Sequence, residues 1–186
     1  MIGSVLFLAL AVAVFAYFAW AIRYHFVSTR MPMAMRIVSV LAAAALLTGI
    51  IAILRSPPDN GRLALAAVGV LAALGVFHAA VRATHGHGLT LAFDPVAPPR
   101  IAGSGPYRWV RHPFYLSYIL FWAALLIAAP VWLLAALTFA LVLFYVNSAL
   151  IEERTILASP QAESYRAATR SAGFLCPKLT LIRGQR

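Results

Sequence analysis

Arg111-His112 and Glu152-Glu153 are the residues of this chain whose types and spacing best suit chemistry. An imidazole beside two carboxylates can exchange protons or hold a positively charged ligand. The chain has five acidic residues, and two of them stand side by side at the end of a long apolar stretch. An acidic side chain beside a membrane span is a functional candidate, because its charge is costly there. Tyr107 and Tyr115 bracket the Arg-His pair with aromatic rings.

The composition places these residues in a membrane protein. Apolar residues make up 63% of the 186 residues and charged residues 11%, whereas soluble domains carry about 25% charged residues. The single cysteine excludes an intrachain disulfide. Disordered chains, coiled coils and secreted disulfide scaffolds are thereby excluded, and the composition predicts a small all-α polytopic membrane protein.

Five apolar stretches predict membrane-spanning helices, at residues 2–22, 37–54, 63–81, 114–129 and 131–151. About 20 helical residues cross a hydrocarbon core of roughly 30 Å. Each stretch must be helical, because lipid offers the backbone no hydrogen-bond partner. The fourth stretch reaches only about 24 Å, so we expect it to be tilted, sheltered by its neighbours or paired tightly with the fifth.

The basic residues predict how the chain lies across the bilayer. With the N-terminus outside, thirteen Lys and Arg residues face the cytoplasm and two, Arg55 and Arg62, face outward. Positively charged loops stay on the cytoplasmic side, so the C-terminus is predicted to be cytoplasmic. Arg outnumbers Lys fourteen to one, which is consistent with a GC-rich bacterium, and we expect a bacterial inner (plasma) membrane.

The short connection at Ala129-Pro130 predicts that the last two spans form an antiparallel hairpin. This hairpin brings Arg111-His112-Pro113 level with Glu152-Glu153, and Pro113 suits the first turn of a helix. The Glu pair is expected at a helix C-terminus, where the macrodipole disfavours negative charge. Arg108, Arg154 or a bound cation is therefore expected to compensate for it.

Two polar segments border the hairpin on the predicted cytoplasmic side. The loop 82–112 contains several prolines, and loops of this length are commonly functional. In the tail, the sequence predicts a short amphipathic helical segment in two parts, residues 152–157 and residues 161–170. His85 and His87, with His78 and His112, hint at a metal site, but no cysteine or carboxylate lies nearby in sequence. A flexible polar loop is the preferred interpretation, and no metal site is predicted.

Three ordered motifs run from residue 100 to residue 177. Residues 105–115, which include Tyr107 and Arg111-His112-Pro113-Phe114-Tyr115, match the pattern G-x-Y-x-x-x-R-H-P-x-Y. Glu152-Glu153 follow a hydrophobic hairpin, and Tyr165-Arg166 with Phe174-Leu175-Cys176-Pro177 close the segment. With these motifs the chain resembles membrane methyltransferases of the isoprenylcysteine carboxyl methyltransferase type, a superfamily that also includes phospholipid N-methyltransferases.

The resemblance implies S-adenosyl-L-methionine bound on the cytoplasmic side, between the third loop, the hairpin and the tail. Carried over by position, the cofactor-binding residues are Arg100, Ile101, Ala102, Tyr107, His112, Pro113, Phe114, Tyr115 and Glu152. The catalytic candidates are Arg111, His112 and Glu153. Two positions depart from the pattern: Ser117 stands where the family often has Gly, and Ser148 stands where the isoprenylcysteine enzymes have an Arg near the substrate.

The predicted function is S-adenosyl-L-methionine-dependent methyl transfer to a membrane-embedded, lipid-like acceptor. A single domain, residues 1–186, would carry it, with three helices in 1–81 and the catalytic loop, hairpin and tail in 82–186. Phospholipid N-methylation is the alternative activity, and a non-catalytic membrane binding or assembly protein of the same fold is the alternative from another class. The expected partners are the lipid bilayer and a lipophilic methyl acceptor, not nucleic acid, and no oligomeric state is predicted.

Overall fold

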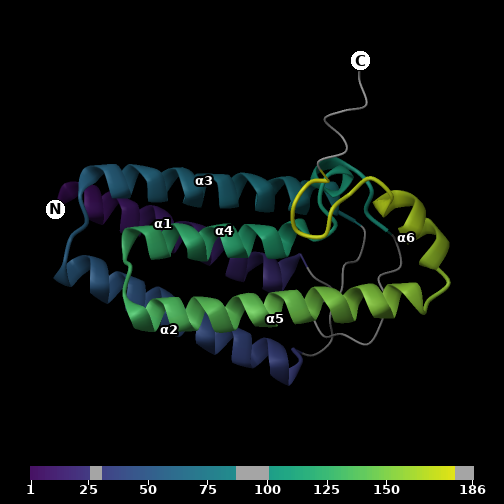
Figure 1. Ribbon diagram of the computed structural model, residues 1–186, viewed down its shortest axis with the longest axis horizontal. Helices are drawn as coiled ribbons and strands as arrows, with labels where there is room; N and C mark the ends of the chain where they lie inside the picture. Colours follow the sequence, from purple (N-terminus) through teal and green to yellow (C-terminus); the bar gives the residue numbers. More distant parts are fainter. Residues whose placement is uncertain (26–30, 87–100, 179–186) are drawn as a thin grey trace, which may run out of the picture.

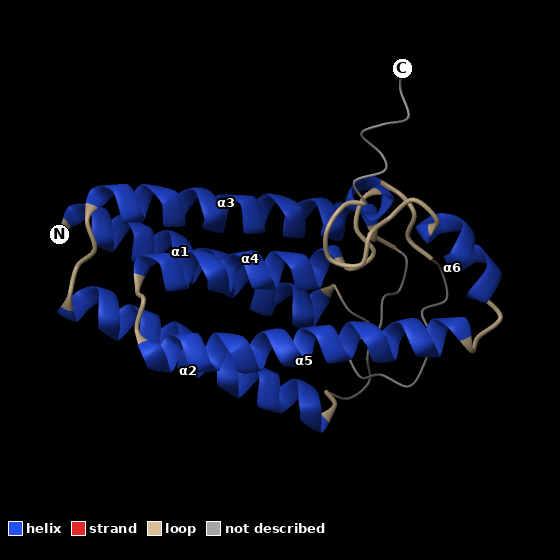
Figure 2. Cartoon of the chain, in the orientation of Figure 1, coloured by secondary structure: helices blue, strands red, loops and turns tan. Residues whose placement is uncertain are grey.

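The computed structural model describes residues 1–25, 31–86 and 101–178, and most of these residues are helical (Figure 2). Their helices are α1 (Ile2–Tyr24), α2 (Met33–Arg55), α3 (Asn60–Ala83), the 3-10 helix η1 (Gly105–Arg108), α4 (Pro113–Ala128), α5 (Trp132–Leu157) and α6 (Ala162–Thr169). Within the described residues, the β-type pairing is one isolated parallel bridge between Val110 and Gly173. The prediction of an all-α chain is confirmed.

All five apolar stretches form helices. Among the described residues, α1, α2, α3 and α5 are long and apolar enough to cross a bilayer, and α4 is a shorter apolar helix. The chain is therefore a multi-pass membrane protein. The prediction for the end of α5 is wrong: this helix continues to Leu157, so residues 152–157 belong to the hairpin and not to the tail helix. The helix continues because no Pro or Gly interrupts it before Pro160.

The short helix α4 is sheltered by the other helices. Its most extensive contacts are with α3, and it also packs against α5 and α2 (Figure 1). Gly69 of α3 permits the close approach, since a Cβ atom there would lie 2.8 Å from the Cβ of Ala124. The expected sheltering is confirmed, but the closest partner is α3 and not the hairpin helix α5.

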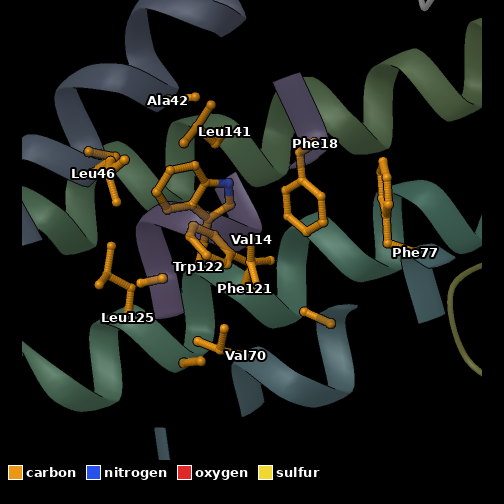
Figure 3. Close-up of a cluster of buried hydrophobic side chains, with 14 of the residues drawn as sticks. Val14, Phe18, Ala42, Leu46, Val70, Phe77, Phe121, Trp122, Leu125 and Leu141 are labelled. Carbon is orange, nitrogen blue, oxygen red and sulfur yellow. The ribbon is translucent and has the colours of Figure 1, made fainter. Parts of the chain in front are cut away.

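An aromatic cluster fixes α1 against α3 and α4 in the centre of the bundle (Figure 3). The ring centroids of Phe18 and Phe77 lie 4.4 Å apart, and those of Phe18 and Phe121 lie 5.5 Å apart. Trp122 meets Phe121 edge-on at 5.0 Å, a favourable arrangement for aromatic quadrupoles. Because these large rings pack against one another, they fix the positions of α1, α3 and α4 relative to each other.

The polar segments gather at one end of the bundle. The N-terminus and the α2–α3 and α4–α5 connections lie at the opposite end, where Asp59 caps α3 by accepting a hydrogen bond of 2.9 Å from the backbone N–H of Arg62 (Figure 1). The 3-10 helix η1, the start of α4, the end of α5 and α6 lie together at the other end (Figure 1). We call this the polar end, and it contains the residues singled out for chemistry.

Candidate functional site

Glu153 is the centre of a hydrogen-bonded cluster at the polar end. Its carboxylate accepts hydrogen bonds from Nη1 of Arg111 at 3.1 Å and from the Tyr165 hydroxyl at 2.9 Å. Nε2 of His112 lies 3.0 Å from Oε1 of the same carboxylate. Arg111 and Glu153 also form an ion pair, with a shortest distance of 2.9 Å. The carboxylate therefore joins the segment before α4, the helix α5 and the helix α6.

A backbone clamp positions the Arg-His pair. The N–H of Arg111 donates to the carbonyl oxygen of Gly173 at 2.8 Å, and the N–H of Gly173 donates to the carbonyl oxygen of Trp109 at 3.0 Å. Any Cβ atom on Gly173 would overlap the carbonyl oxygen of Cys176, so this position needs glycine. Pro113 then begins α4 at its first turn, so the clamp and the helix start together fix His112.

Tyr165 brings the tail helix into the site. It is the buried residue of α6, and its hydroxyl donates to Glu153. Burial raises the pKa of the Tyr165 hydroxyl, and the nearby charge of Glu153 raises this pKa further. The hydroxyl consequently stays protonated at neutral pH and remains a hydrogen-bond donor.

Glu152 points in a different direction from Glu153. Successive residues of an α-helix are turned by about 100°, so the two carboxylates do not share one environment. Oε2 of Glu152 lies 3.8 Å from Nδ1 of His112, which is its one ion pair among the described residues and is longer than a hydrogen bond. Its side chain is 41% exposed. Glu153 is thus held by three side chains, whereas Glu152 hydrogen-bonds with Tyr115 and keeps a partly exposed carboxylate that a ligand can reach.

The charge that balances Glu153 comes from Arg111. The expected candidates Arg108 and Arg154 are both exposed, and the prediction that either of them compensates is wrong. The prediction that the pair ends its helix is wrong too, because α5 continues for a full turn beyond Glu153. The macrodipole acts at the last turn of a helix, so the local ion pair is the stronger influence on Glu153.

A cavity of about 270 Å³ opens beside Glu152. This volume is close to the lower end of the range for small-molecule sites, roughly 300–1,000 Å³. Polar residues line it at the polar end of the bundle: Arg111, His112, Glu152, Tyr165 and Thr169. Apolar side chains from α1, α2 and α4 line the remainder, among them Phe18, Val38, Ala42 and Trp122. One cavity thus joins a charged site to a lipophilic space.

Three tyrosines carry polar atoms from the charged site toward the middle of the spans. Tyr115 and Tyr145 stack with their ring centroids 6.1 Å apart, and Tyr118 lies 5.3 Å from Tyr145. The indole N–H of Trp122 donates to the hydroxyl oxygen of Tyr145 at 3.1 Å. All three tyrosine side chains line the cavity, so its wall combines aromatic faces with hydroxyl groups.

The cavity gathers most of the residues predicted from the sequence motifs. Of the predicted cofactor-binding residues, those that line it are Ile101, Ala102, Tyr107, His112, Pro113, Phe114, Tyr115 and Glu152. Arg100, and likewise His87, lie outside the described residues. Among the predicted catalytic residues, Arg111 and His112 line the cavity. Glu153 is not one of the described residues that line it, and it contacts the site through those two side chains.

The first two helices contribute lining residues that the sequence does not predict. Met35, Val38 and Ala42 of α2 face the cavity, but their residue types are the same as those of lipid-facing positions, so no signal distinguished them. The positions of Tyr118 and Tyr145, by contrast, could have indicated a site. Tyrosine is typical of membrane interfaces, and these two lie well inside α4 and α5.

The polar groups at this end suit a ligand with an amino-acid moiety. Nε of Arg111 is buried and has no hydrogen-bond partner among the described residues, a situation that costs about 1–3 kcal/mol. A ligand carboxylate would satisfy this donor, and a ligand ammonium would pair with Glu152. Burial raises the pKa of Tyr107 well above its usual value, so its ring stays neutral and offers an aromatic face to a cation. These groups fit S-adenosyl-L-methionine.

Fold and site together define the class: a multi-pass α-helical membrane protein with a charged ligand site at one end of its bundle. The family follows from sequence comparison. The chain belongs to the isoprenylcysteine carboxyl methyltransferase family, whose model matches residues 65–159, and it is thus a membrane methyltransferase by family. No curated protein and no solved structure matches the chain. Tyr165 and Gly173 lie beyond the matched residues, so their contacts are known from the structure alone.

Proposed function

We propose that this chain transfers the methyl group of S-adenosyl-L-methionine to a lipid-like acceptor that reaches the site from within the bilayer. One observation carries the proposal: a single cavity has Glu152 and the unpartnered Nε of Arg111 at one end and apolar side chains at the other. The donor is polar and water-soluble and the acceptor is lipophilic. The charged end of the cavity therefore suits the donor, and the apolar end suits the acceptor.

At the charged end, Glu152 would hold the ammonium of the donor and Arg111 its carboxylate. Hydrogen bonds between charged groups are about twice as strong as neutral ones, so these two residues would fix the amino-acid end. When bound, S-adenosyl-L-methionine supplies a methyl group attached to a positively charged sulfur. The faces of Tyr107 and Tyr115 would favour that positive charge by about 0.5–2 kcal/mol.

At the apolar end, the walls would hold the hydrocarbon part of the acceptor. Helices α1 and α2 both line the cavity but make few contacts with each other. An acceptor chain can therefore enter laterally between them, with its reactive group directed toward His112. Holding two reactants in line and excluding water provide most of the rate enhancement in such a transfer.

The charge distribution supports the proposed orientation in the membrane. Placing the polar end in the cytoplasm keeps thirteen basic residues inside and gives the donor access from the aqueous side. We assign the chain to a bacterial inner (plasma) membrane in this orientation, with the N-terminus outside.

Calorimetry on the full chain in detergent tests the proposal. The wild-type protein should bind S-adenosyl-L-methionine, and Glu152→Gln or His112→Ala should weaken binding at least about tenfold, or 1.4 kcal/mol. Glu163→Gln is the matched control, because Glu163 is an exposed residue of α6. Full-strength binding by both site variants would contradict the site. Absence of binding by the wild type would favour a non-catalytic membrane protein of the same fold.

A further inference from the structure

We propose that the acceptor is an amine carried by a lipid, and that Nδ1 of His112 takes the amine proton when the methyl group is transferred. The inference rests on the proposed function and names its substrate class. The observation behind it is the placement of one buried imidazole between two carboxylates of different character.

The contact with Glu153 determines which ring nitrogen of neutral His112 carries the hydrogen. An ionised carboxylate only accepts hydrogen bonds, and Nε2 lies 3.0 Å from Oε1 of Glu153. Nε2 therefore carries the hydrogen, and Nδ1 keeps its lone pair. Nδ1 lies 3.8 Å from Glu152, too far for a hydrogen bond, on a side chain that lines the cavity. In serine proteases a carboxylate likewise fixes the tautomer of a histidine, there with the hydrogen on Nδ1, and leaves the opposite nitrogen, Nε2, as the general base.

The charged groups around His112 belong to the hairpin and the segment before α4. The charge of Arg111 is balanced by its ion pair with Glu153, and the carboxylate of Glu152 lies 3.8 Å from Nδ1 of His112. Among the described residues, the ring contacts Tyr115 of α4, Glu152 and Glu153 of α5 and Phe174 of the tail. Arg111, and Tyr165 of α6, lie one contact further away, on the carboxylate of Glu153.

An acceptor carboxylate suits this site less well. It would need a cation, and among the described lining residues the candidates are Arg111 and His112. Nη1 of Arg111 is bound to Glu153, and its Nε is assigned to the carboxylate of the donor. The hydroxyl of Ser148 donates to the carbonyl oxygen of Phe144 at 2.7 Å, within its own helix. An ionised carboxylate also has no proton to lose, so it would leave Nδ1 without a role.

An amine suits both the base and the wall. The ammonium that forms with the new N–C bond is positively charged until its proton leaves, and aromatic faces stabilise such a charge; Tyr115, Tyr118 and Tyr145 provide them. In the transfer, the lone pair of the neutral amine forms the new N–C bond. The S–C bond of the sulfonium breaks, its electron pair stays on sulfur as a thioether, and one N–H proton passes to Nδ1 of His112. His112 then returns the proton to water.

Matched amphiphiles test the substrate class. The full chain in detergent is given methyl-labelled S-adenosyl-L-methionine with dodecylamine, dodecanoic acid or dodecanol, which differ only in the head group. We expect transfer to dodecylamine at least about 100-fold faster than to the other two, the usual size of a general-base effect. Preferential labelling of dodecanoic acid or dodecanol would overturn the inference. So would binding of S-adenosyl-L-methionine without any transfer to dodecylamine, whereas failure to bind the donor would overturn the proposed function itself.

A tautomer measurement tests the role of Glu153 without relying on activity. In protein labelled with ¹⁵N-histidine, the wild type should show His112 with its hydrogen on Nε2, the signal being assigned by its loss in His112→Gln. In Glu153→Gln the new amide can donate to Nε2 and move the hydrogen to Nδ1. We expect kcat for dodecylamine to fall at least about 100-fold, with KM and donor affinity within about threefold.

Glu163→Gln, which removes an exposed charge from α6, should change neither the tautomer nor kcat. Glu153→Gln with the wild-type tautomer and rate would contradict the positioning role. If that variant does not fold, the wild-type spectrum still decides, because a hydrogen on Nδ1 of His112 would overturn the inference.

Discussion

The hydroxyl of Tyr165 donates a hydrogen bond to Oε1 of Glu153 at 2.9 Å, which joins the tail helix α6 to the hairpin. The same oxygen faces Nε2 of His112 at 3.0 Å. The segment after the last membrane span is therefore part of the site, because the carboxylate that orients His112 is itself held by the tail.

Replacement of Tyr165 by Phe should lower the free energy of unfolding by about 1.5–3 kcal/mol, the usual value for a hydrogen bond to a charged group. Burial and Glu153 raise the pKa of Tyr165 above its usual value. A raised tyrosine pKa keeps the contribution intact below the unfolded value near 10, and the contribution is lost only as the pH rises through the folded value. Thermal unfolding of both proteins should thus give the same difference from about pH 6 to 9. A difference that shrinks over this range would show that the hydroxyl ionises in the folded protein.

Replacement of Gly173 by Ala should break the backbone clamp, because the new methyl group would overlap the carbonyl oxygen of Cys176. Loss of the hydrogen bonds to Arg111 and Trp109 should cost about 1–3 kcal/mol and weaken donor binding. Unfolding and calorimetry measure the two effects. Ser171→Ala, an exposed neighbour, should leave both unchanged, and equal behaviour of the two variants would contradict the clamp.

Replacement of Gly69 by Ala should push α3 and α4 apart, since the added Cβ would lie 2.8 Å from that of Ala124. Overpacking of this kind costs about 1–3 kcal/mol. Gly75→Ala is the matched control in the same helix, because nothing lies within 4 Å of its added Cβ. The control should keep its thermal midpoint or gain stability, as alanine favours helix by about 1 kcal/mol over glycine. A Gly69→Ala protein as stable as the control would contradict the close packing.

Cys176 is a natural reporter of orientation. It is the only cysteine of the chain and is exposed beside the polar end. A membrane-impermeant maleimide should label it in inside-out vesicles and not in intact spheroplasts, if the polar end is cytoplasmic. In a Cys176→Ser background, Asp59→Cys at the opposite end of the bundle should show the reverse pattern. Labelling of Cys176 from outside would contradict the assigned orientation.

The sequence alone predicts the features that depend on local composition, namely the apolar helices and the hairpin. Apolar length predicted the five helices, and the short connection at Ala129-Pro130 predicted the hairpin that brings Arg111 and His112 to Glu153. The end of α5 lies beyond the predicted limit because the first charged residues end the apolar stretch but not the helix. A helix that leaves the bilayer can continue into water, and α5 does so until it approaches Pro160.

The different roles of the two carboxylates could not be predicted from their positions in sequence. Adjacent residues face different directions on a helix, and only the packed structure places Glu153 among three donors and Glu152 on the cavity. The wall formed by α2 was equally hidden. Its residues Val38 and Ala42 are apolar, and an apolar residue suits a lipid-facing surface and a substrate cavity alike.

The most direct test is an experimental structure of the protein with S-adenosylhomocysteine bound. We expect the ligand in the cavity beside His112, with its ammonium within hydrogen-bond distance of Glu152, its carboxylate at Nε of Arg111 and its sulfur toward the tyrosine wall. A ligand bound outside this cavity, or with its amino-acid end away from Glu152 and Arg111, would contradict the proposed site.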